Sequence, residues 1–444
     1  MATAGGRHAS ASSVNSGGSR TLWIALISAL ILALAAGGIW ALSRNSGEAQ
    51  PETGLAAAQS EPQSEAEPAP DPQSEVAPAP EPESPPVDFT IAAGGDILLH
   101  NTVFWASQEA DGRYNLSRLL STTAPYVEGA DLALCQMEVP IAQAGQEPSN
   151  YPMFAAPYET AEELREAGWD GCSTASNHSV DWGYAGLVNT LDRFDEAGLG
   201  HAGTARSAEE LLAPQYYQIE KNGQTLTVAH ISFANNLNGM EIPAEAPWSI
   251  NLNDVQMVLE QAKQARANGA DLVIVSYHCC AIEYTSIPED LQVSTAQTLG
   301  ESGLVDIMIS HHAHVPKPID RVPGGPNGDG MWVAYGTGNF ISDQDETCCV
   351  PESNVGVLIF FEVQKAADGA VTVPDASWSA VMTERKYGYY TRVITAEGAA
   401  DSPVPLEEIQ WRHQMVAEVM GTGLGSERSS APTDPGTTTV VRRN

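Results

Sequence analysis

Basic residues are scarce in this chain of 444 residues. Lys and Arg number 21 against 56 Asp and Glu, the formal net charge is -35, and no Lys or Arg occurs between Arg44 and Arg113. A surface that binds nucleic acid must neutralise phosphates with basic side chains, so the composition argues against DNA or RNA as a partner. An acidic surface keeps an exposed protein soluble by self-repulsion. It also retains a polyanion poorly, except through a metal ion.

Cysteine is scarce as well, and no Cys-x-x-Cys spacing is present. Thiolate ligation of a metal is therefore the weaker alternative. An even number of cysteines outside the cytoplasm permits disulfides. We expect a bridge between the adjacent pair at 279 and 280 and the adjacent pair at 348 and 349, and a second bridge between Cys135 and Cys172.

Long apolar runs are absent except for one, from Leu22 to Leu42, which contains no charge. A helix that crosses a bilayer needs about 20 such residues. An Arg flanks the run on each side and a Trp lies near each end, as is typical of membrane anchors. The alternative, a cleaved signal peptide, usually has an apolar core of about 7–15 residues. The sequence thus predicts a cytoplasmic tail over 1–20 and a single transmembrane helix over 21–43.

Residues 44–86 form an acidic, Pro-rich segment that cannot bury enough apolar surface to fold. As an extended linker of about 3.1 Å per residue, it could hold the following domain on the order of 100 Å from the bilayer. We therefore expect the domain over 87–400 to lie on the extracellular face of the cell membrane. The remaining residues, 401–444, should form a helix and then a disordered tail from about Ser426.

The chain after residue 86 alternates between strand-like and helix-like patterns. The predicted strands cover 89–93, 132–134, 226–233, 272–276, 305–309, 332–335 and 355–363. The predicted helices cover 160–168 with Thr160 as cap, 187–197 ending at Gly198, 253–268 ending at Gly269, and 294–302. This order predicts an α/β fold with a largely parallel sheet and helices on its faces. The strand-rich stretch near the end predicts a second sheet packed on the first.

Polar side chains follow several of these strands, and such positions meet at the carboxyl edge of a sheet. The residues concerned are Asp96, Glu138, Asn177, His178, His278, His312 and His314. The last two flank a single alanine, and alternate residues of an extended loop point the same way. Both imidazoles could then bind one ion, which makes this pair the strongest single signal.

His178 has a different predicted role from the neighbouring Asn177. The Asn177 amide oxygen could join a metal site while the His178 imidazole faces the substrate as a proton donor. Asp181, three residues further on, could orient that imidazole and raise its basicity. The alternative for Asn177 and His178 is an ordinary helix cap.

Six motifs together resemble the CapA family of bacterial capsule and poly-γ-glutamate synthesis proteins. They are GDILLH at 95–100, MEVPI at 137–141, ASNHSVDWG at 175–183, His278 with Glu283 and Tyr284, SHHAHV at 310–315, and YGTGNF at 335–340. The resemblance implies a metallophosphatase-like α/β/β/α sandwich. It also implies a membrane-anchored outer protein that works with a polyglutamate synthase complex on an anionic polymer.

The resemblance assigns roles to individual residues. It implies that the metal ligands are Asp96, Glu138, Asn177, His278, His312 and His314. It makes His178 the general acid with Asp181 as its partner, and it places His100, Glu283, Tyr284 and Asn339 around the substrate. Mixed nitrogen and oxygen ligands favour Mn, Fe or Zn.

The sequence also departs from the phosphoesterase pattern that this family resembles. Leu98 occupies the position of a ligating histidine, Glu138 that of a bridging aspartate, and Gln136 that of an asparagine. Two cysteines follow His278 where Trp-Gly is usual. The ion number is therefore one or two. Three functions are compatible with this pattern: a capsule or polyglutamate assembly factor, a surface metal-dependent phosphoesterase, and a binding scaffold with a degenerate site.

Overall fold

The computed structural model describes residues 85–443. The expected cytoplasmic tail, the expected transmembrane helix and nearly all of the expected linker lie outside the described residues. Within 85–443, none of the helices combines the length and the apolar character that crossing a bilayer requires.

The first sheet has nine strands and is mixed. Its main path runs β14-β13-β12-β1-β2-β3-β4, β11 also pairs with β1, and β15 also pairs with β13. The bounds are β1 Val87–Ile97, β2 Leu132–Met137, β3 Gly171–Ser173, β4 Gly200–Ala202, β11 Asn339–Ile341, β12 Val355–Lys365, β13 Val371–Thr383, β14 Thr391–Ile394 and β15 Ser426–Glu427. Strands β1 to β4 are parallel, whereas β12 to β14 are antiparallel to their neighbours.

The second sheet has seven strands in the order β16-β5-β6-β7-β8-β10-β9. The bounds are β5 Gln215–Lys221, β6 Gln224–Ala234, β7 Leu272–His278, β8 Ile307–His311, β9 Pro316–Val322, β10 Met331–Thr337 and β16 Thr437–Val441. The expectation that the late strands build the second sheet holds for the strand predicted at 332–335, which is part of β10, and is wrong for the strand predicted at 355–363. Strands β12 to β14 instead extend the first sheet beside β1, and the middle of the chain forms the second.

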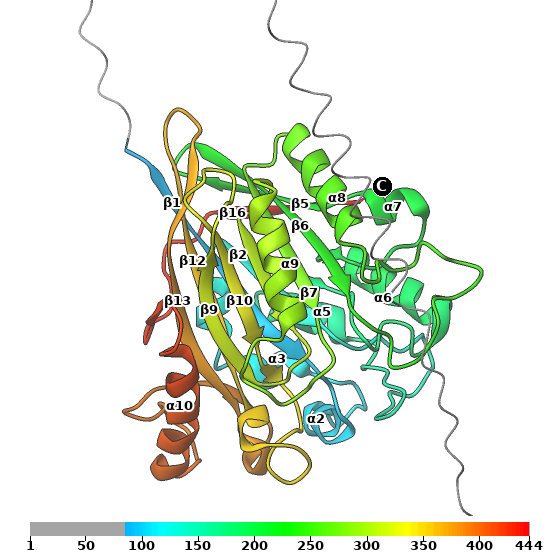
Figure 1. Ribbon diagram of the computed structural model, residues 1–444. Coiled ribbons are helices and arrows are strands. Elements are labelled where there is room, and N and C mark those ends of the chain that lie inside the picture. Colours follow the sequence, from blue (N-terminus) through cyan, green and yellow to red (C-terminus); the bar gives the residue numbers. More distant parts are fainter. Residues whose placement is uncertain (1–84, 444) are drawn as a thin grey trace, which may run out of the picture. The chain divides into compact units, whose positions relative to one another are not determined.

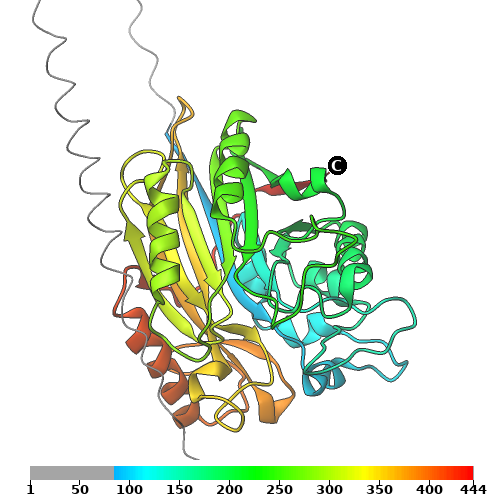
Figure 2. The same ribbon diagram turned by 45° about the vertical axis from the view of Figure 1, so that its right-hand side comes forward.

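The helices lie on the outer faces of the two sheets (Figures 1 and 2). Helices α2 Asn101–Ser107, α3 Leu116–Leu120, α4 Ala124–Glu128, α5 Thr160–Glu166 and α6 Gly183–Ala197 pack on the first sheet through a core that includes Trp169 and Phe360. Helices α8 Val255–Ala267 and α9 Asp290–Glu301 pack on the second sheet. A separate core, with Ile91, Ile274 and Phe361, joins the two sheets. These layers form an α/β/β/α arrangement.

Helix boundaries follow local capping signals. The Asp254 side chain accepts the backbone N–H of Met257 and starts α8. Gly198 has a φ of 74° and ends α6, as predicted. Thr160 is the first residue of α5 and Glu159 precedes it as cap, so the predicted Thr160 cap is wrong by one position. Helices α6 and α9 each begin four residues before their predicted starts.

Aspartates precede four parallel strands at the edges opposite the site. Each side chain accepts a backbone N–H from the adjacent strand: Asp131 from Thr90 at 2.7 Å, Asp170 from Ala133 at 2.9 Å, Asp271 from Thr227 at 2.8 Å and Asp306 from Val273 at 2.6 Å. These bonds hold neighbouring strands in register at their amino ends.

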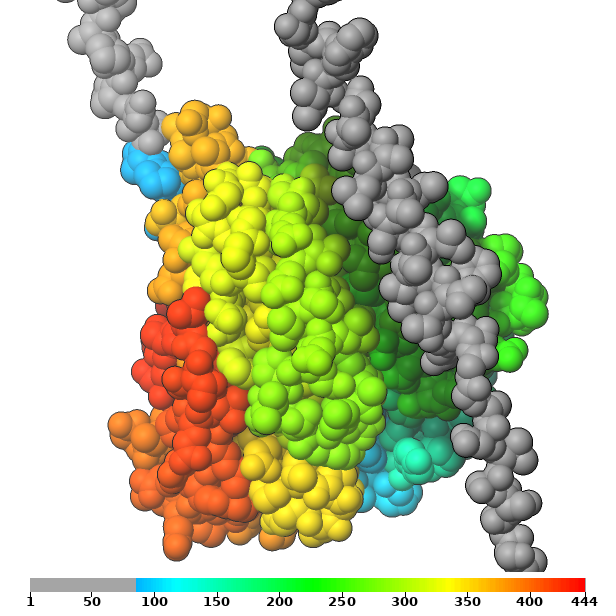
Figure 3. All heavy atoms as spheres, in the orientation of Figure 1, coloured from blue at the N-terminus to red at the C-terminus, as the bar shows by residue number. Residues whose placement is uncertain are grey.

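The C-terminal part forms helix α10, Leu406–Met420, whose buried Ile409 and Val416 belong to the core between the sheets. In the space-filling view, its orange-red surface covers the lower left of the visible face (Figure 3). The tail beyond it contains two short strands, whereas disorder was predicted from Ser426 onward. Strand β15 pairs with β13, and β16 pairs antiparallel with β5, the edge of the second sheet.

The cysteines pair differently from the main expectation. Cys135 on β2 is bonded to Cys172 on β3, as predicted. The predicted cross-loop bridge is wrong, because Cys279 is bonded to Cys280 and Cys348 to Cys349. Each adjacent pair therefore closes on itself.

Helix α7, Ala208–Leu212, precedes β5 and starts with Ser207, whose hydroxyl accepts the N–H of Glu210. Short 3-10 turns lie at Pro351–Asn354, just before β12, and at Arg385–Tyr387, between β13 and β14.

Candidate metal centre and active site

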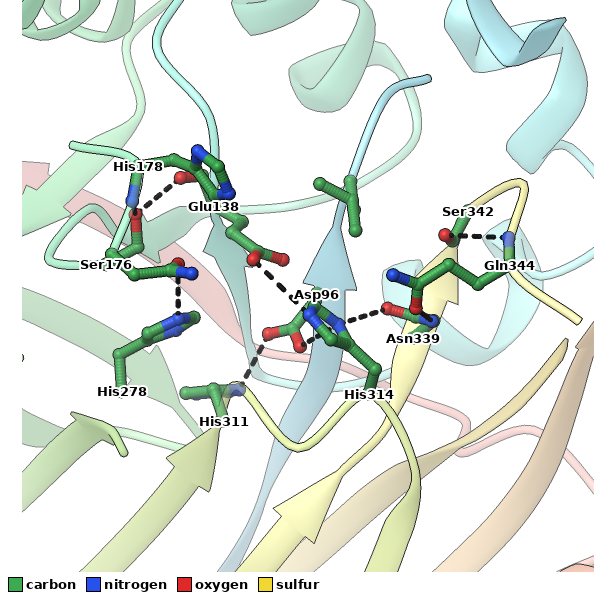
Figure 4. A network of polar contacts seen from close by, with 12 residues as sticks. Asp96, Glu138, Ser176, His178, His278, His311, His314, Asn339, Ser342 and Gln344 are labelled. Carbon is green, nitrogen blue, oxygen red and sulfur yellow. Dashed lines mark hydrogen bonds and ion pairs between the residues drawn. The ribbon is translucent and has the colours of Figure 1, made fainter. Parts of the chain in front are cut away.

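The predicted metal ligands lie at or just beyond the carboxyl ends of strands. Asp96 is on β1, Glu138 follows β2, Asn177 follows β3, His278 ends β7, and His312 and His314 follow β8. In Figure 4, Asp96, Glu138 and His314 point toward one another from different strands. The site therefore lies where the carboxyl ends of the two sheets meet.

Two glycines allow Asp96 to reach this position. A Cβ atom on Gly94 would collide with the ring of Trp169, and one on Gly95 would collide with the backbone carbonyl of Gly338. The N–H of Asp96 donates to that carbonyl at 3.0 Å. The Gly-Gly-Asp sequence is thus required by close packing of β1 against its neighbours.

The carboxylates of Asp96 and Glu138 are fully buried, with side chains 0% exposed. None of their four oxygens has a hydrogen-bond partner within the described residues. Burial raises the pKa of Glu138 well above its usual range, although the nearby His314 opposes this rise. Buried carboxylate oxygens without partners are costly unless a cation meets them.

His314 lies between the two carboxylates. Its Nδ1 is 3.3 Å from Asp96 Oδ2, and its Nε2 is 3.6 Å from Glu138 Oε1. Nδ1 donates to Asn339 Oδ1 at 3.0 Å, while Asn339 Nδ2 donates to Gln344 Oε1 at 2.9 Å. Burial would lower the pKa of His314, but Glu138 and Asp96 raise it to about 10. Asn339 orients this ring, so the predicted substrate-binding residue contacts a predicted ligand instead.

Asn177, His278 and His312 form the other half of the site. His278 Nε2 lies 2.9 Å from Asn177 Oδ1, and the His278 and His312 ring centroids are 4.9 Å apart. The second ring nitrogen of His278 and Nδ1 of His312 are buried without partners in the described part of the chain. Burial, reinforced by neighbouring histidines, lowers the pKa of His278 well below its usual range and that of His312 to about 4. Both shifts favour the neutral imidazole, which is the form that binds a metal.

The loop that carries His312 and His314 is not extended, in contrast to the prediction. Their φ angles are 84° and 58°, in the left-handed region that non-glycine residues rarely adopt. The two ring centroids are nevertheless 6.0 Å apart. The rings converge because of this unusual backbone and not because alternate residues of a strand share a face.

His178 and Asp181 are in direct contact, as predicted. His178 Nδ1 donates to Asp181 Oδ2 at 2.8 Å, and the same oxygen accepts the N–H of Phe154 at 2.7 Å. The ring of Phe154 packs edge-on against His178 at 4.9 Å. With the proton held at Nδ1, His178 Nε2 accepts from Asn238 Nδ2 at 3.2 Å. Nε2 is thus the atom that can receive or give a proton.

Asn238 and His311 contribute to the site and were missed from sequence. Asn238 lies on a loop after β6, and its Oδ1 accepts from Asn177 Nδ2 at 3.2 Å. His311 is buried, with Nδ1 3.6 Å from Asp96 Oδ1 and 3.0 Å from Thr337 Oγ1. The doubled histidine at 311 and 312 was a visible signal for the second residue. No sequence pattern marked Asn238.

A cavity of about 740 Å³ opens beside these residues. Its lining includes His100, Asn177, His178, Glu283, Tyr284, Gln344 and the Cys348–Cys349 pair. The same cavity is therefore lined by the predicted general acid, His178, and by three predicted substrate-binding residues, His100, Glu283 and Tyr284. Leu98, by contrast, is buried in the core of the first sheet.

His100 contacts the loop after β11 and not the carboxylates. Its Nδ1 accepts the N–H of Asp343 at 3.3 Å, and its ring packs edge-on against Phe154 at 5.3 Å. Burial lowers the pKa of His100 to about 4, although Asp343 opposes this. His100 therefore does not supply the metal-binding nitrogen that is missing because position 98 is a leucine.

The comparison with protein families agrees with this geometry. The family model described as "Bacterial capsule synthesis protein PGA_cap" matches residues 90–344, a range that contains every site residue predicted from the sequence. The chain belongs to the PGA_cap family.

Two curated relatives are similar to this PGA_cap member. The chain is 28% identical over 267 residues to "Capsule biosynthesis protein CapA" of Bacillus anthracis, which covers 58% of this chain and 61% of the relative. It is 26% identical over 216 residues to "PGA biosynthesis protein CapA" of Bacillus subtilis, covering 48% and 52%. The matches thus span little more than half of these relatives' lengths.

Solved structures give more distant likenesses. The calcineurin-like phosphoesterase YfkN from Bacillus subtilis shares 16% identity at a TM-score of 0.41, covering 75% of this chain and 99% of that one. A putative 5'-nucleotidase from Staphylococcus aureus shares 13% identity at a TM-score of 0.42, covering 75% and 58%. For this PGA_cap member, the mixed α/β fold is the extent of that likeness.

The donors present in this PGA_cap member fit a divalent cation. Asp96, Glu138 and His314 each offer one ligand atom, and these atoms lie within 4.8 Å of one another. Asn177 Oδ1 and His278 Nε2, 2.9 Å apart, have the separation expected of two donors on one ion, since metal–ligand distances are about 2.0–2.2 Å. The hydrogen bond from Asn339 to His314 is the kind of contact that orients a ligating imidazole.

Proposed function

We propose that this chain takes part in the assembly of a bacterial capsule or of poly-γ-glutamate, and that it acts through a divalent-cation site. The observation that carries the proposal is the pair of buried carboxylates, Asp96 and Glu138, whose oxygens lack hydrogen-bond partners among residues 85–443. They occur in a chain of the bacterial capsule synthesis family.

The residues that would hold the cation come from both sheets. They are Asp96, Glu138, Asn177, His278, His312 and His314, which provide oxygen and nitrogen donors for one or two ions of Mn, Fe or Zn. When bound, such an ion polarises a phosphoryl or carbonyl oxygen. The tilt of His314 is set by Asn339, and Gln344 holds Asn339 in turn.

An anionic polymer suits this site only if a cation is present. No Lys or Arg is among the residues that line the cavity within the described part of the chain, and the formal net charge is -35. Carboxylates of a polyglutamate chain would be repelled by such a surface. A cation at the base of the cavity supplies the attraction that the side chains do not.

His178 is positioned to handle a proton at the cavity wall. Asp181 fixes its tautomer, because the carboxylate accepts from Nδ1 and leaves Nε2 facing Asn238. In a bond-breaking reaction, Nε2 would give a proton to the leaving group, and Asp181 would stabilise the imidazolium before that transfer. This dyad favours a second candidate function, that of a surface metal-dependent phosphoesterase. Without turnover, the same site would act as a polymer-binding scaffold.

The location and partners are part of the proposal. The apolar run from Leu22 to Leu42 and the linker after it support a single-pass anchor in the cell membrane, with the folded domain on the extracellular face. The names of the relatives, which speak of capsule and PGA biosynthesis, support a role in making such a polymer. The partner we propose for that role is a polyglutamate synthase complex.

A gene deletion in the native organism, with complementation, tests the proposal. The deletion strain should lose surface polymer, measured as glutamate or sugar released by acid hydrolysis of washed cells. The wild-type gene should restore it, and an Asp96→Ala gene should not. Asp320→Ala removes an exposed carboxylate on β9 and serves as the matched control. Normal polymer in the deletion strain would exclude the capsule function, and a phosphoesterase screen of the purified chain would then test the second candidate.

A further inference from the structure

Glu283 has a position that its predicted role as a substrate-binding residue does not explain. Its carboxylate, one nitrogen of His312 and one nitrogen of His314 all lie within 4.8 Å of one another. The two histidines are buried, at 3% exposure each, whereas Glu283 is half-buried on the cavity wall. Two imidazoles and one carboxylate form a common donor set for Zn, Fe and Mn.

The main chain fixes this arrangement. The N–H of Tyr284 donates to the carbonyl of Ala313 at 2.8 Å, so the segment that carries Glu283 is bonded to the loop that carries both histidines. Tyr284 has a φ of 60°, which turns the chain at this point. Its hydroxyl accepts from Gln344 at 3.1 Å. Glu283 is therefore held against the histidines by bonds on its C-terminal side.

The other side of Glu283 is held as well. The N–H groups of Ala281 and Ile282 donate to the Glu289 carboxylate, at 3.4 and 3.2 Å, at the start of α9. The loop between β7 and α9 is thus built so that Glu283 reaches the site. His312 independently indicates a cation at this position, because its Nδ1 is buried without a hydrogen-bond partner among the described residues.

Charge also argues against a substrate-binding role. If the substrate is a polycarboxylate, a Glu283 carboxylate on the cavity wall would repel it. The same carboxylate would instead stabilise a cation that neutralises both partners. Leu98 leaves the phosphoesterase-like ligand set one donor short, and His100 does not replace it.

We propose that Glu283 is a metal ligand that forms, with His312 and His314, the part of the cation site exposed to the cavity. This inference rests on the proposed function, since it adds a donor to the same site. The cation bound through Glu283 is the one that a carboxylate or phosphate oxygen of the substrate would meet. Asp96 and Glu138 are fully buried behind it.

Metal titration of the purified full-length chain tests the inference without an activity assay. Chelator-treated protein is titrated with Co²⁺, with bound metal measured by equilibrium dialysis and ligand geometry by visible absorption. Glu283→Gln should weaken binding at least tenfold, the lower end of the loss seen even for residues behind the ligands, and should change the Co²⁺ spectrum. Glu241→Gln, which removes an exposed carboxylate next to the cavity residue Met240, should behave like the wild type.

The outcomes separate this inference from the proposed function. If Glu283→Gln binds Co²⁺ with wild-type affinity and spectrum while His312→Ala with His314→Ala does not bind it, only the role of Glu283 is overturned. If the wild-type chain binds no Co²⁺, Mn²⁺ or Zn²⁺, the metal site itself is overturned. Unfolding in chelator should be the same for Glu283→Gln and the wild type, so that a weaker affinity cannot result from misfolding.

Discussion

The two sheets bring different chemistry to the same site. The first sheet supplies oxygen donors, from Asp96, Glu138 and Asn177, and the second supplies imidazoles, from His278, His312 and His314. The loop after β7 adds the proposed ligand Glu283 on the side of the second sheet. Donors from both sheets together give the mixed nitrogen and oxygen set that suits Mn, Fe or Zn. The proposed six-residue site therefore depends on the packing of one sheet against the other, and a cation would connect donors that the fold has already brought together.

Removing imidazoles of the second sheet should have the largest effect on metal binding. His312→Ala with His314→Ala should abolish binding of divalent ions. At a metal concentration of 100 times Kd, binding stabilises the native state by about 2.7 kcal/mol, and this contribution should disappear. Elemental analysis and thermal unfolding with and without chelator measure both effects. The control is His413→Ala, which removes an imidazole of helix α10 that is hydrogen-bonded to Glu427 on β15. Wild-type metal content in the double variant would show that the site is misassigned.

His178 lies on the side of the first sheet but is not a ligand in this comparison. His178→Ala should therefore reduce turnover by about 10²–10⁴-fold while bound metal stays constant, because a general acid contributes about that factor. Asp181→Asn should cost less, since it can still accept from Phe154 N–H and only loses its charge. Rates on an activated phosphodiester, together with metal content, measure the two effects. Normal polymer output from cells carrying His178→Ala would reject the catalytic role.

The oxygen side of the site can be tested at Glu138. Glu138→Gln should weaken metal binding by about 10–100-fold, because it replaces a charged donor by a neutral one. In chelator, the same change should not lower the free energy of unfolding, since a buried carboxylate without a cation or another partner is destabilising. Calorimetric titration and denaturant unfolding give the two numbers. A large loss of stability in chelator would show that Glu138 is a structural residue.

The smallest expected effect concerns charge on the second sheet. Lys317 on β9 is fully buried, its Nζ donates to Gln292 Oε1 at 2.9 Å, and burial lowers its pKa to about 8. The unfolded chain then binds more protons than the folded one between about pH 8 and its usual pKa near 10.5, so stability should rise with pH over that range. Lys317→Met should remove this rise and raise stability at pH 7 by about 1–3 kcal/mol. Gln292 Oε1 keeps a donor in the N–H of Glu289.

Denaturant unfolding from pH 7 to pH 10.5 measures this difference. Lys365→Met is the matched control, because Lys365 pairs with Asp271 at the far end of β12 and its ammonium is partly exposed. Equal slopes for the wild type and Lys317→Met would contradict the prediction.

The sequence predicts much of the fold because the central strands are short apolar runs. Strands such as β7, Leu272–His278, are buried on both faces, so their hydrophobicity is visible without any contact information. The membership of each strand in a sheet is not visible in this way. β12 pairs with β1 over a register that joins Val87 to Lys365, and no local pattern records such a distant partner.

The same distinction holds for the site. The ligands at strand ends could be predicted because the carboxyl ends of parallel strands meet at one edge of a sheet. A single sequence shows which polar residues follow each strand. Asn238 and His311 were missed because their contacts join segments that only the tertiary structure brings together. Asn238 contacts Asn177 on another loop, and His311 on β8 lies near Asp96 on β1 of the other sheet. The disulfides show the same limit. Two cysteines next to each other in the sequence do not reveal whether they bond to one another or across to a second pair.

The pairing of β16 with β5 has a consequence for the order in which the chain folds during synthesis. The edge of the second sheet is completed by Thr437–Val441, which leave the ribosome long after their partner strand β5. The first strand, β1, likewise waits for β12 before its antiparallel side is paired. Such distant pairings make folding slow and leave unpaired strand edges exposed for longer. Folding of this protein should therefore be sensitive to deletion of Thr437–Val441, although none of these residues lines the cavity.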